Sequence, residues 1–219
     1  LTGNMARTLM RLGYDREPRV SRAVDWLLSV QLEDGGWNCW DGGTHGSFEA
    51  TVQPLGALSE IPQEHRSDEV EEAISHAVDF FLSHRLFKSS RDESVVLFRF
   101  LKFHFPLHYK YDVLHGLRVI TSLGVKDDRL HDPIQLLVSK QQPDGAWILD
   151  AVPRGWRLFS PSHGGWRQEE DEVIEKGWGE EPHTLQFEEV GTPSKMITLN
   201  ALRVLKNLDT LKLPTEYLA

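Results

Sequence analysis

The sequence predicts an all-α protein made of antiparallel helix pairs, and three observations lead to this fold class. Apolar residues recur every three or four positions in seven segments, whereas no segment alternates between apolar and polar residues over a useful length. A segment that ends in Asp-Gly-x-Trp occurs twice, at 21–37 and at 131–147. The expected connections alternate between short and long, which places the long ones together at one end of the helix pairs.

Each expected helix carries its own apolar stripe. The helices are expected at 2–13, 19–32, 47–60, 68–84, 111–123, 130–142 and 195–208. Their stripes are, in order, Met5, Leu9 and Leu12; Val20, Val24 and Leu27; Phe48, Val52 and Leu55; Val70, Ile74, Val78 and Phe81; Val113, Leu117 and Ile120; Leu130, Ile134 and Leu137; and Ile197, Ala201 and Leu205.

Residues suited to helix ends lie at several of these boundaries. Gly13 and Gly124 are placed to cap the C-terminal ends of two helices. Asp68 with Glu71 resembles a capping box at the start of the fourth helix, and Ser194 is a good N-cap for the last.

The long connections are the place to look for a functional site, because loops on a rigid scaffold usually carry function. Six of the seven tryptophans lie in them, and we expect all three connections to meet at one rim. The short connections are 14–18, 61–67 and 124–129, and the long ones are 33–46, 85–110 and 143–194.

The composition is that of a globular chain with an acidic balance. The 219 residues carry a net charge of −9 and are 40% hydrophobic, which argues against a general nucleic-acid binder. No apolar run approaches the roughly 18 residues that span a bilayer, so we expect no transmembrane segment. The single Cys39 excludes an internal disulfide framework. No targeting segment is visible, and we expect a cytoplasmic protein.

The two repeated segments end in QLEDGGW at 31–37 and in QQPDGAW at 141–147. These resemble the QxxDGxW motifs of squalene–hopene cyclases and protein prenyltransferases. The resemblance implies an (α/α) toroid or partial toroid, in which inner helices ring a central cavity and outer helices surround them. Helices 19–32, 68–84 and 130–142 would be outer, and the other four inner. Within the motif, Asp-Gly supplies a tight turn, the Trp ring stacks on the Gln amide, and the Gln bonds free carbonyls at the helix end.

More closely, the chain resembles a group of bacterial prenyltransferase-like proteins. Members of that group carry further N-terminal helices, so we expect residues 1–219 to form a single toroid domain that lacks N-terminal helix pairs. The matching stretches are LTGNMARTLMRLGY, DGGWNC followed by THGSFEAT, HRLFKSSR, FHFPLHYKYDVLHGL and FEEVGTPSKMITLNALRVLK.

The resemblance implies a protein that binds an isoprenoid, an isoprenoid diphosphate or a similar apolar ligand in the central cavity. It leaves open whether the protein also processes that ligand by a prenyltransferase-like reaction. Class II terpene cyclase chemistry is not expected, because the chain has no DxDD motif. Two alternatives are a non-catalytic scaffold that binds a protein partner and a carbohydrate-active α/α barrel.

A zinc site is one hypothesis for the rim. Cys39 follows the first DGGW, and His45 and Glu49 are four residues apart at the start of an inner helix, so both can face one metal. His108 or Asp112 would add a ligand from the start of the next inner helix, where the resemblance places the zinc histidine of protein prenyltransferases. The alternative is a buried cysteine beside a polar helix start, since the spacing matches no strict zinc signature.

Basic and aromatic side chains are interleaved in 85–110. At the N-terminal ends of inner helices they are suited to hold a diphosphate above an apolar cavity. The alternative, which we favour, is that the aromatic rings pack, while the cations either keep their charges in water above apolar surface or pair with the acidic loop within 143–194. The expected ligand-binding residues are Arg85, Lys88, Arg91, Arg99, Lys102, Tyr109 and Tyr111, with Trp40 and Trp156 from the other two long connections.

Two carboxylates, Asp112 and Glu188, are the candidate catalytic residues. Asp112 begins an inner helix, where it is either a general acid facing the cavity or the charge partner of the helix dipole. Glu188 and Glu189 lie shortly before Pro193 and Ser194 at the start of the last inner helix, so one of these two side chains is expected to point into the cavity. The rest of 143–194 is expected to be a solvated loop whose charges pair with one another.

Overall fold

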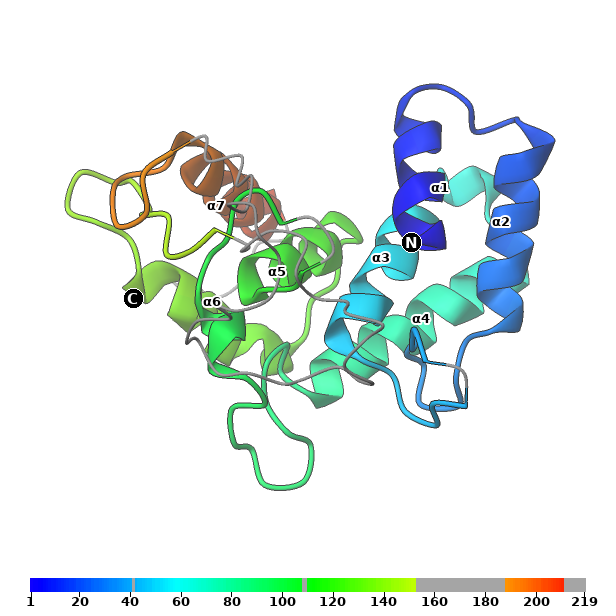
Figure 1. Cartoon of the computed structure of the whole chain (residues 1–219), viewed down its shortest axis with the longest axis horizontal. Coiled ribbons are helices and arrows are strands. Elements are labelled where there is room, and N and C mark those ends of the chain that lie inside the picture. Colours follow the sequence, from blue (N-terminus) through cyan, green and yellow to red (C-terminus); the bar gives the residue numbers. More distant parts are fainter. Residues whose placement is uncertain (41, 108–109, 153–187, 211–219) are drawn as a thin grey trace, which may run out of the picture.

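The computed structural model describes residues 1–40, 42–107, 110–152 and 188–210 (Figure 1). This part of the chain contains α-helices and short 3-10 helices but no β-strand, so the predicted all-α class is confirmed. The α-helices are α1 (Thr2–Arg11), α2 (Pro18–Ser29), α3 (Phe48–Leu58), α4 (Asp68–Ser83), α5 (Val113–Ser122), α6 (His131–Ser139) and α7 (Lys195–Thr210). The 3-10 helices are η1 (Gln63–His65), η2 (Phe98–Leu101) and η3 (Asp128–Leu130).

The odd-numbered helices pack against one another in series. Helix α1 contacts α3, α3 contacts α5, and α5 contacts α7. Helices α2, α4 and α6 pack against α1, α3 and α5 respectively, and α2 also contacts α4. Figure 1 shows α1 to α4 grouped on one side of the molecule and α5 to α7 on the other.

All seven expected helices are present, and the two that precede the DGxW segments end three residues earlier than predicted. The helices expected at 19–32 and 130–142 end at Ser29 and Ser139. The reason is that the glutamine of each repeated segment already belongs to the turn. The side-chain amides of Gln31 and Gln141 donate to the Gly35 and Gly145 carbonyls, at 2.8 and 3.2 Å.

The helix ends are capped largely as the sequence predicts. Gly13 and Gly124 follow the ends of α1 and α5 with φ of 84° and 75°, which is the left-handed conformation that glycine favours. The Ser194 hydroxyl accepts from the Ile197 N–H at 3.0 Å. The capping box at Asp68 was wrong by one residue, because the Ser67 hydroxyl accepts from the Val70 N–H and Glu71 pairs with Arg66 instead.

The core is centred on the aromatic ring of Phe48, the first residue of α3. Its centroid lies 5.1 to 5.8 Å from those of Phe80, Phe81, Phe100 and Tyr111. These rings come from α4, from η2 in the 85–110 connection and from the residues before α5. Edge and tilted contacts of this kind add to the stabilisation from burial alone, so the second long connection is part of the core.

We expect Gly35→Ala to destabilise the protein much more than Gly145→Ala. Both glycines have a positive φ, 82° and 84°, which costs an alanine about 1–2 kcal/mol. A Cβ at Gly35 would also lie 2.2 Å from the His76 carbonyl oxygen, whereas at Gly145 the nearest atom is 3.9 Å away. Overpacking of this kind adds about 1–3 kcal/mol. Urea unfolding of both variants measures the difference, and equal losses would contradict the close approach of this turn to α4.

Candidate functional site

The tryptophans of the two DGxW segments join the end of an even-numbered helix to the start of an odd-numbered one. The Trp37 indole N–H donates to the Leu27 carbonyl at 2.8 Å, and its backbone N–H donates to the Thr51 hydroxyl at 2.9 Å. The Trp37 carbonyl accepts from the Ser47 N–H at 2.9 Å. These bonds fix where the first long connection leaves α2 and where it enters α3.

The second segment makes the same set of bonds. The Trp147 indole donates to Leu137, its N–H to Thr198, and its carbonyl accepts from Ser194, at 2.8, 2.9 and 2.8 Å. One detail differs from the expected motif, because the indole, not the glutamine, bonds the carbonyl near the helix end. Gln31 instead bonds its own turn and the Ala73 carbonyl of α4, at 2.9 Å.

Among the described residues, the side chains expected to bind zinc do not form one site. Cys39 is exposed, so the alternative of a buried cysteine was wrong. The His45 side chain is 79% exposed and lies 3.9 Å from Asp34, while Glu49 is bonded to Arg99 at 2.5 Å. His108 lies outside the described residues. Over the described ranges, no three His, Cys, Asp or Glu side chains are grouped as metal ligands.

Three cations of the 85–110 connection are paired with carboxylates of other elements or of their own loop. Lys88 and Arg85 both reach Asp132 at the start of α6, at 2.5 and 3.8 Å. Arg85 also contacts Glu93 at 3.3 Å. Arg99 is bonded to Glu49 of α3. These cations are therefore paired, but with carboxylates of α3, of α6 and of their own loop. Most of the acidic loop that was expected to pair with them lies outside the described residues.

The aromatic residues of the same connection divide into two groups. Phe87, Phe100 and Phe103 are buried. Tyr111, directly after this connection, is also buried, and its hydroxyl donates to the Leu86 carbonyl at 2.7 Å. Phe98 is 75% exposed, and Trp40 of the first long connection is 54% exposed. The remaining expected ligand-binding residues are Arg91, which is exposed, Lys102, which is half-buried and has an interaction partner, and Tyr109 and Trp156, which lie outside the described residues.

Both candidate catalytic carboxylates bind backbone N–H groups at helix starts. Asp112 is 1% exposed and accepts from the backbone N–H groups of His115 and His104, each at 2.8 Å. Glu188 accepts from the Ser194 hydroxyl and from the Lys195 N–H, the latter at 2.9 Å. The structure therefore gives each of them a capping role at α5 and α7.

A group of arginines on the odd-numbered helices was missed by the sequence analysis. Arg118 is the only residue from Val113 to Thr121 that is not buried. Burial, together with the charges of Arg7, Arg203 and Arg11, lowers the pKa of Arg118 to about 10. The signal available in the sequence was one arginine within an otherwise apolar helix, which by itself indicates only a solvent-facing position.

Burial also governs the protonation of a histidine one turn before Arg118. His115 is 5% exposed, and burial lowers its pKa to about 4. Asp112 raises this pKa, whereas Arg118 and Arg7 lower it. The imidazole is therefore neutral at pH 7, and its Nδ1 has no hydrogen-bond partner in the part of the chain that the structure describes.

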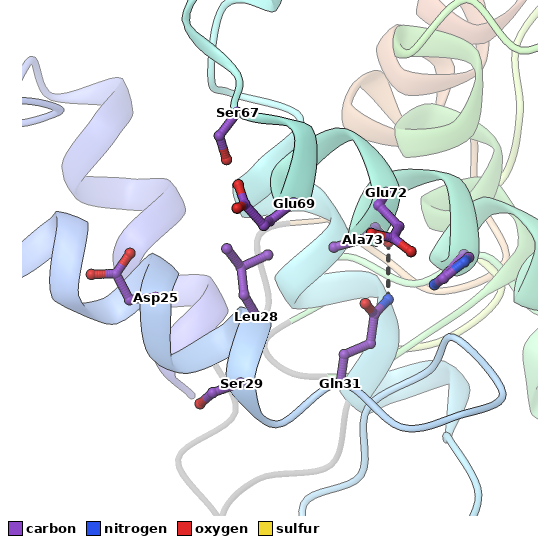
Figure 2. Close-up of a pocket in the computed structure, with 9 residues that line it drawn as sticks. Asp25, Leu28, Ser29, Gln31, Ser67, Glu69, Glu72 and Ala73 are labelled. Carbon is purple, nitrogen blue, oxygen red and sulfur yellow. Dashed lines mark hydrogen bonds between the residues drawn. The ribbon is translucent and has the colours of Figure 1, made fainter.

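A separate groove of about 620 Å³ lies between α2 and α4 (Figure 2). Its lining includes three carboxylates but none of the residues predicted from the sequence. Across it, the Gln31 amide donates to the Ala73 carbonyl. The lining residues are Asp25, Leu28, Ser29, Gln31, Ser67, Glu69, Glu72, Ala73 and His76.

Comparison with known proteins adds no assignment to this geometry. No protein-family model matches the chain, and no solved structure matches it at a significant level. Among the described residues, no helix is both long enough and apolar enough to span a membrane.

We expect the stability of the protein to fall on acidification because of His115. Its pKa is about 4 in the folded chain and 6.5 ordinarily, so between these pH values the unfolded chain takes up a proton that the folded chain does not. The free energy of unfolding should therefore fall by about 2–3 kcal/mol between pH 7 and pH 4.5 from this residue alone.

Urea unfolding of the wild type and His115→Gln at both pH values measures this contribution. The variant should lose about 2–3 kcal/mol less than the wild type over the same interval. An identical loss in the two proteins would show that the His115 imidazole is not held neutral by burial.

Proposed function

We propose that this chain is a toroid-type protein that binds an isoprenoid, or an isoprenoid diphosphate, at the rim where the long connections meet. The observation that carries the proposal is the exposure of Trp40 and Phe98, at 54% and 75%. Each belongs to a long connection that leads into an odd-numbered helix, and large exposed aromatic side chains are typical of surfaces that bind apolar ligands.

The packing order of the helices supports the toroid part of the proposal. Helices α1, α3, α5 and α7 contact one another in series, and α2, α4 and α6 each pack against one of them. This is the neighbour relation that inner and outer helices have in a toroid. The two DGxW tryptophans make the same bonds at α3 and α7, which supports one common plan for the helix pairs.

A second candidate function is a non-catalytic scaffold, and one observation favours binding over chemistry. Asp112 accepts from the N–H groups of His115 in α5 and of His104 in the connection before it, and Glu188 accepts from the Lys195 N–H at the start of α7. An acceptor held in this way stabilises the helix end, and it is not free to transfer a proton to a ligand. We therefore propose binding and assign no reaction.

Substitution of the exposed aromatics tests the binding site. We expect farnesyl diphosphate to bind the wild type and to bind Trp40→Ser and Phe98→Ser about tenfold more weakly, because each change removes roughly 1–2 kcal/mol of apolar contact. Isothermal titration calorimetry measures the affinities. Trp26→Ser is the matched control, since Trp26 is 51% exposed but lies on α2.

The outcomes of this experiment separate the two candidate functions. Unchanged affinity in Trp26→Ser with weaker binding in the other two variants supports the rim. An equal effect in all three variants, or no binding by the wild type, would overturn the isoprenoid proposal and favour the scaffold.

A further inference from the structure

In the described part of the chain, the arginines on the odd-numbered helices outnumber the carboxylates that bind them. They come from different helices: Arg7 and Arg11 from α1, Arg118 from α5 and Arg203 from α7. They are close enough for the charges of the other three to lower the pKa of Arg118. Helix α5 packs against α7, and the Asn207 side-chain amide donates to the Thr121 hydroxyl at 3.2 Å. Arg203 and Arg118 lie about one turn before these two residues, so they are placed on the adjoining faces of the two helices.

The carboxylates near this cluster do not balance it. Glu60 binds Arg7 at 2.9 Å and Arg11 at 2.6 Å, so one negative charge serves two arginines. Asp112 raises the pKa of Arg118, but its two oxygens already accept backbone N–H groups. Among the described residues, Arg118 has no ion pair and no hydrogen bond.

The packing of α1 on α3 holds one of the arginines in place. A Cβ at Gly56 of α3 would lie 2.8 Å from Arg7 Nη1, so the absence of a side chain there makes room for the guanidinium. The Arg7 side chain is 12% exposed and is bonded to Glu60. Ordering a long arginine side chain costs conformational entropy. Because Arg7 is already ordered by its contacts in the folded chain, binding of a ligand does not have to order it.

Two buried nitrogen atoms on the neighbouring helices also lack partners. Gln53 Nε2 on α3 and His115 Nδ1 on α5 have no hydrogen bond in the described part of the chain, although the residues are only 6% and 5% exposed. Gln53 lies one turn before Gly56, and the His115 imidazole is affected by the charges of both Arg7 and Arg118. Such atoms are rare in folded proteins and often mark the position of a bound polar group.

We propose that Arg7, Arg118 and Arg203 bind the diphosphate or phosphate group of a small molecule on the odd-numbered helices. Guanidinium groups match phosphate oxygens in charge and in their forked geometry. The bound anion would supply the negative charge that Glu60 and Asp112 do not. This inference goes beyond the proposed function, because it requires no apolar part in the ligand and uses none of the rim aromatics.

Binding of pyrophosphate is the direct test, because pyrophosphate carries the charge and no apolar group. Calorimetry at low ionic strength should show binding to the wild type and a loss of affinity of about tenfold or more in Arg118→Met. Arg203→Gln should also weaken binding, and its exposed position makes a folding defect unexpected. Arg22→Gln, an exposed arginine on α2, is the matched control and should bind as the wild type does.

Thermal unfolding without ligand separates binding from a structural role of Arg118. Methionine keeps much of the length of the side chain and removes a charge that is partly desolvated and repelled by its neighbours. Arg118→Met should therefore melt at the same temperature as the wild type or higher, and pyrophosphate should raise the melting temperature of the wild type alone. A lower melting temperature in the variant would assign Arg118 to the fold.

The remaining outcomes overturn the proposal. No detectable pyrophosphate binding by the wild type, or the same affinity in Arg118→Met and Arg22→Gln, would show that the cluster is not an anion site. Either result leaves the rim proposal standing, since farnesyl diphosphate binding that depends on Trp40 and Phe98 is measured separately.

Discussion

The fold depends on how the C-terminal end of each even-numbered helix is joined to the N-terminal end of the odd-numbered helix that follows. Both ends carry backbone groups without partners inside their own helix. Trp37 and Trp147 satisfy these groups with one residue each, by an indole bond to a carbonyl near the end of α2 or α6 and by backbone bonds at the start of α3 or α7. The length of chain that follows the tryptophan is then free to vary, and it does so between the 33–46 and 143–194 connections.

The connection between α4 and α5 has no DGxW segment, yet it is closed by a similar arrangement. The Tyr111 hydroxyl donates to the Leu86 carbonyl just beyond α4, and Asp112 caps the start of α5. An aromatic donor and an N-terminal cap again join the two helix ends. The aromatic donor, Tyr111, lies at the end of its connection, whereas Trp37 and Trp147 lie near the start of theirs. A search for a repeated sequence motif therefore does not find it. This junction also buries the Tyr111 ring against Phe48, which ties the 85–110 connection to the core.

The sequence predicted the helices well because their periodicity is local, and it predicted their partners less well because pairing is not. The spacing of Val113, Leu117 and Ile120 is enough to identify α5. The spacing does not show that Lys88 contacts Asp132 or that Arg99 contacts Glu49. These pairs are 44 and 50 positions apart in the sequence. The role of Asp112 was also open from the sequence, since a cap and an acid in a cavity occupy the same position before a helix.

Arg118 was overlooked for a related reason, and it illustrates how a cost in stability points to a binding site. An arginine at one position of an apolar helix is ordinary if it faces water, and costly if three other arginines lie near it. Such a cluster lowers the free energy of unfolding. Binding of an anion raises it again, because a ligand that binds only the folded chain stabilises that state by mass action. In a chain whose net charge is −9, many carboxylates were available to neutralise these arginines, and the described structure places only Glu60 directly among them. The excess positive charge is therefore a property of where the helices place their arginines, and it is the reason for proposing an anion site there.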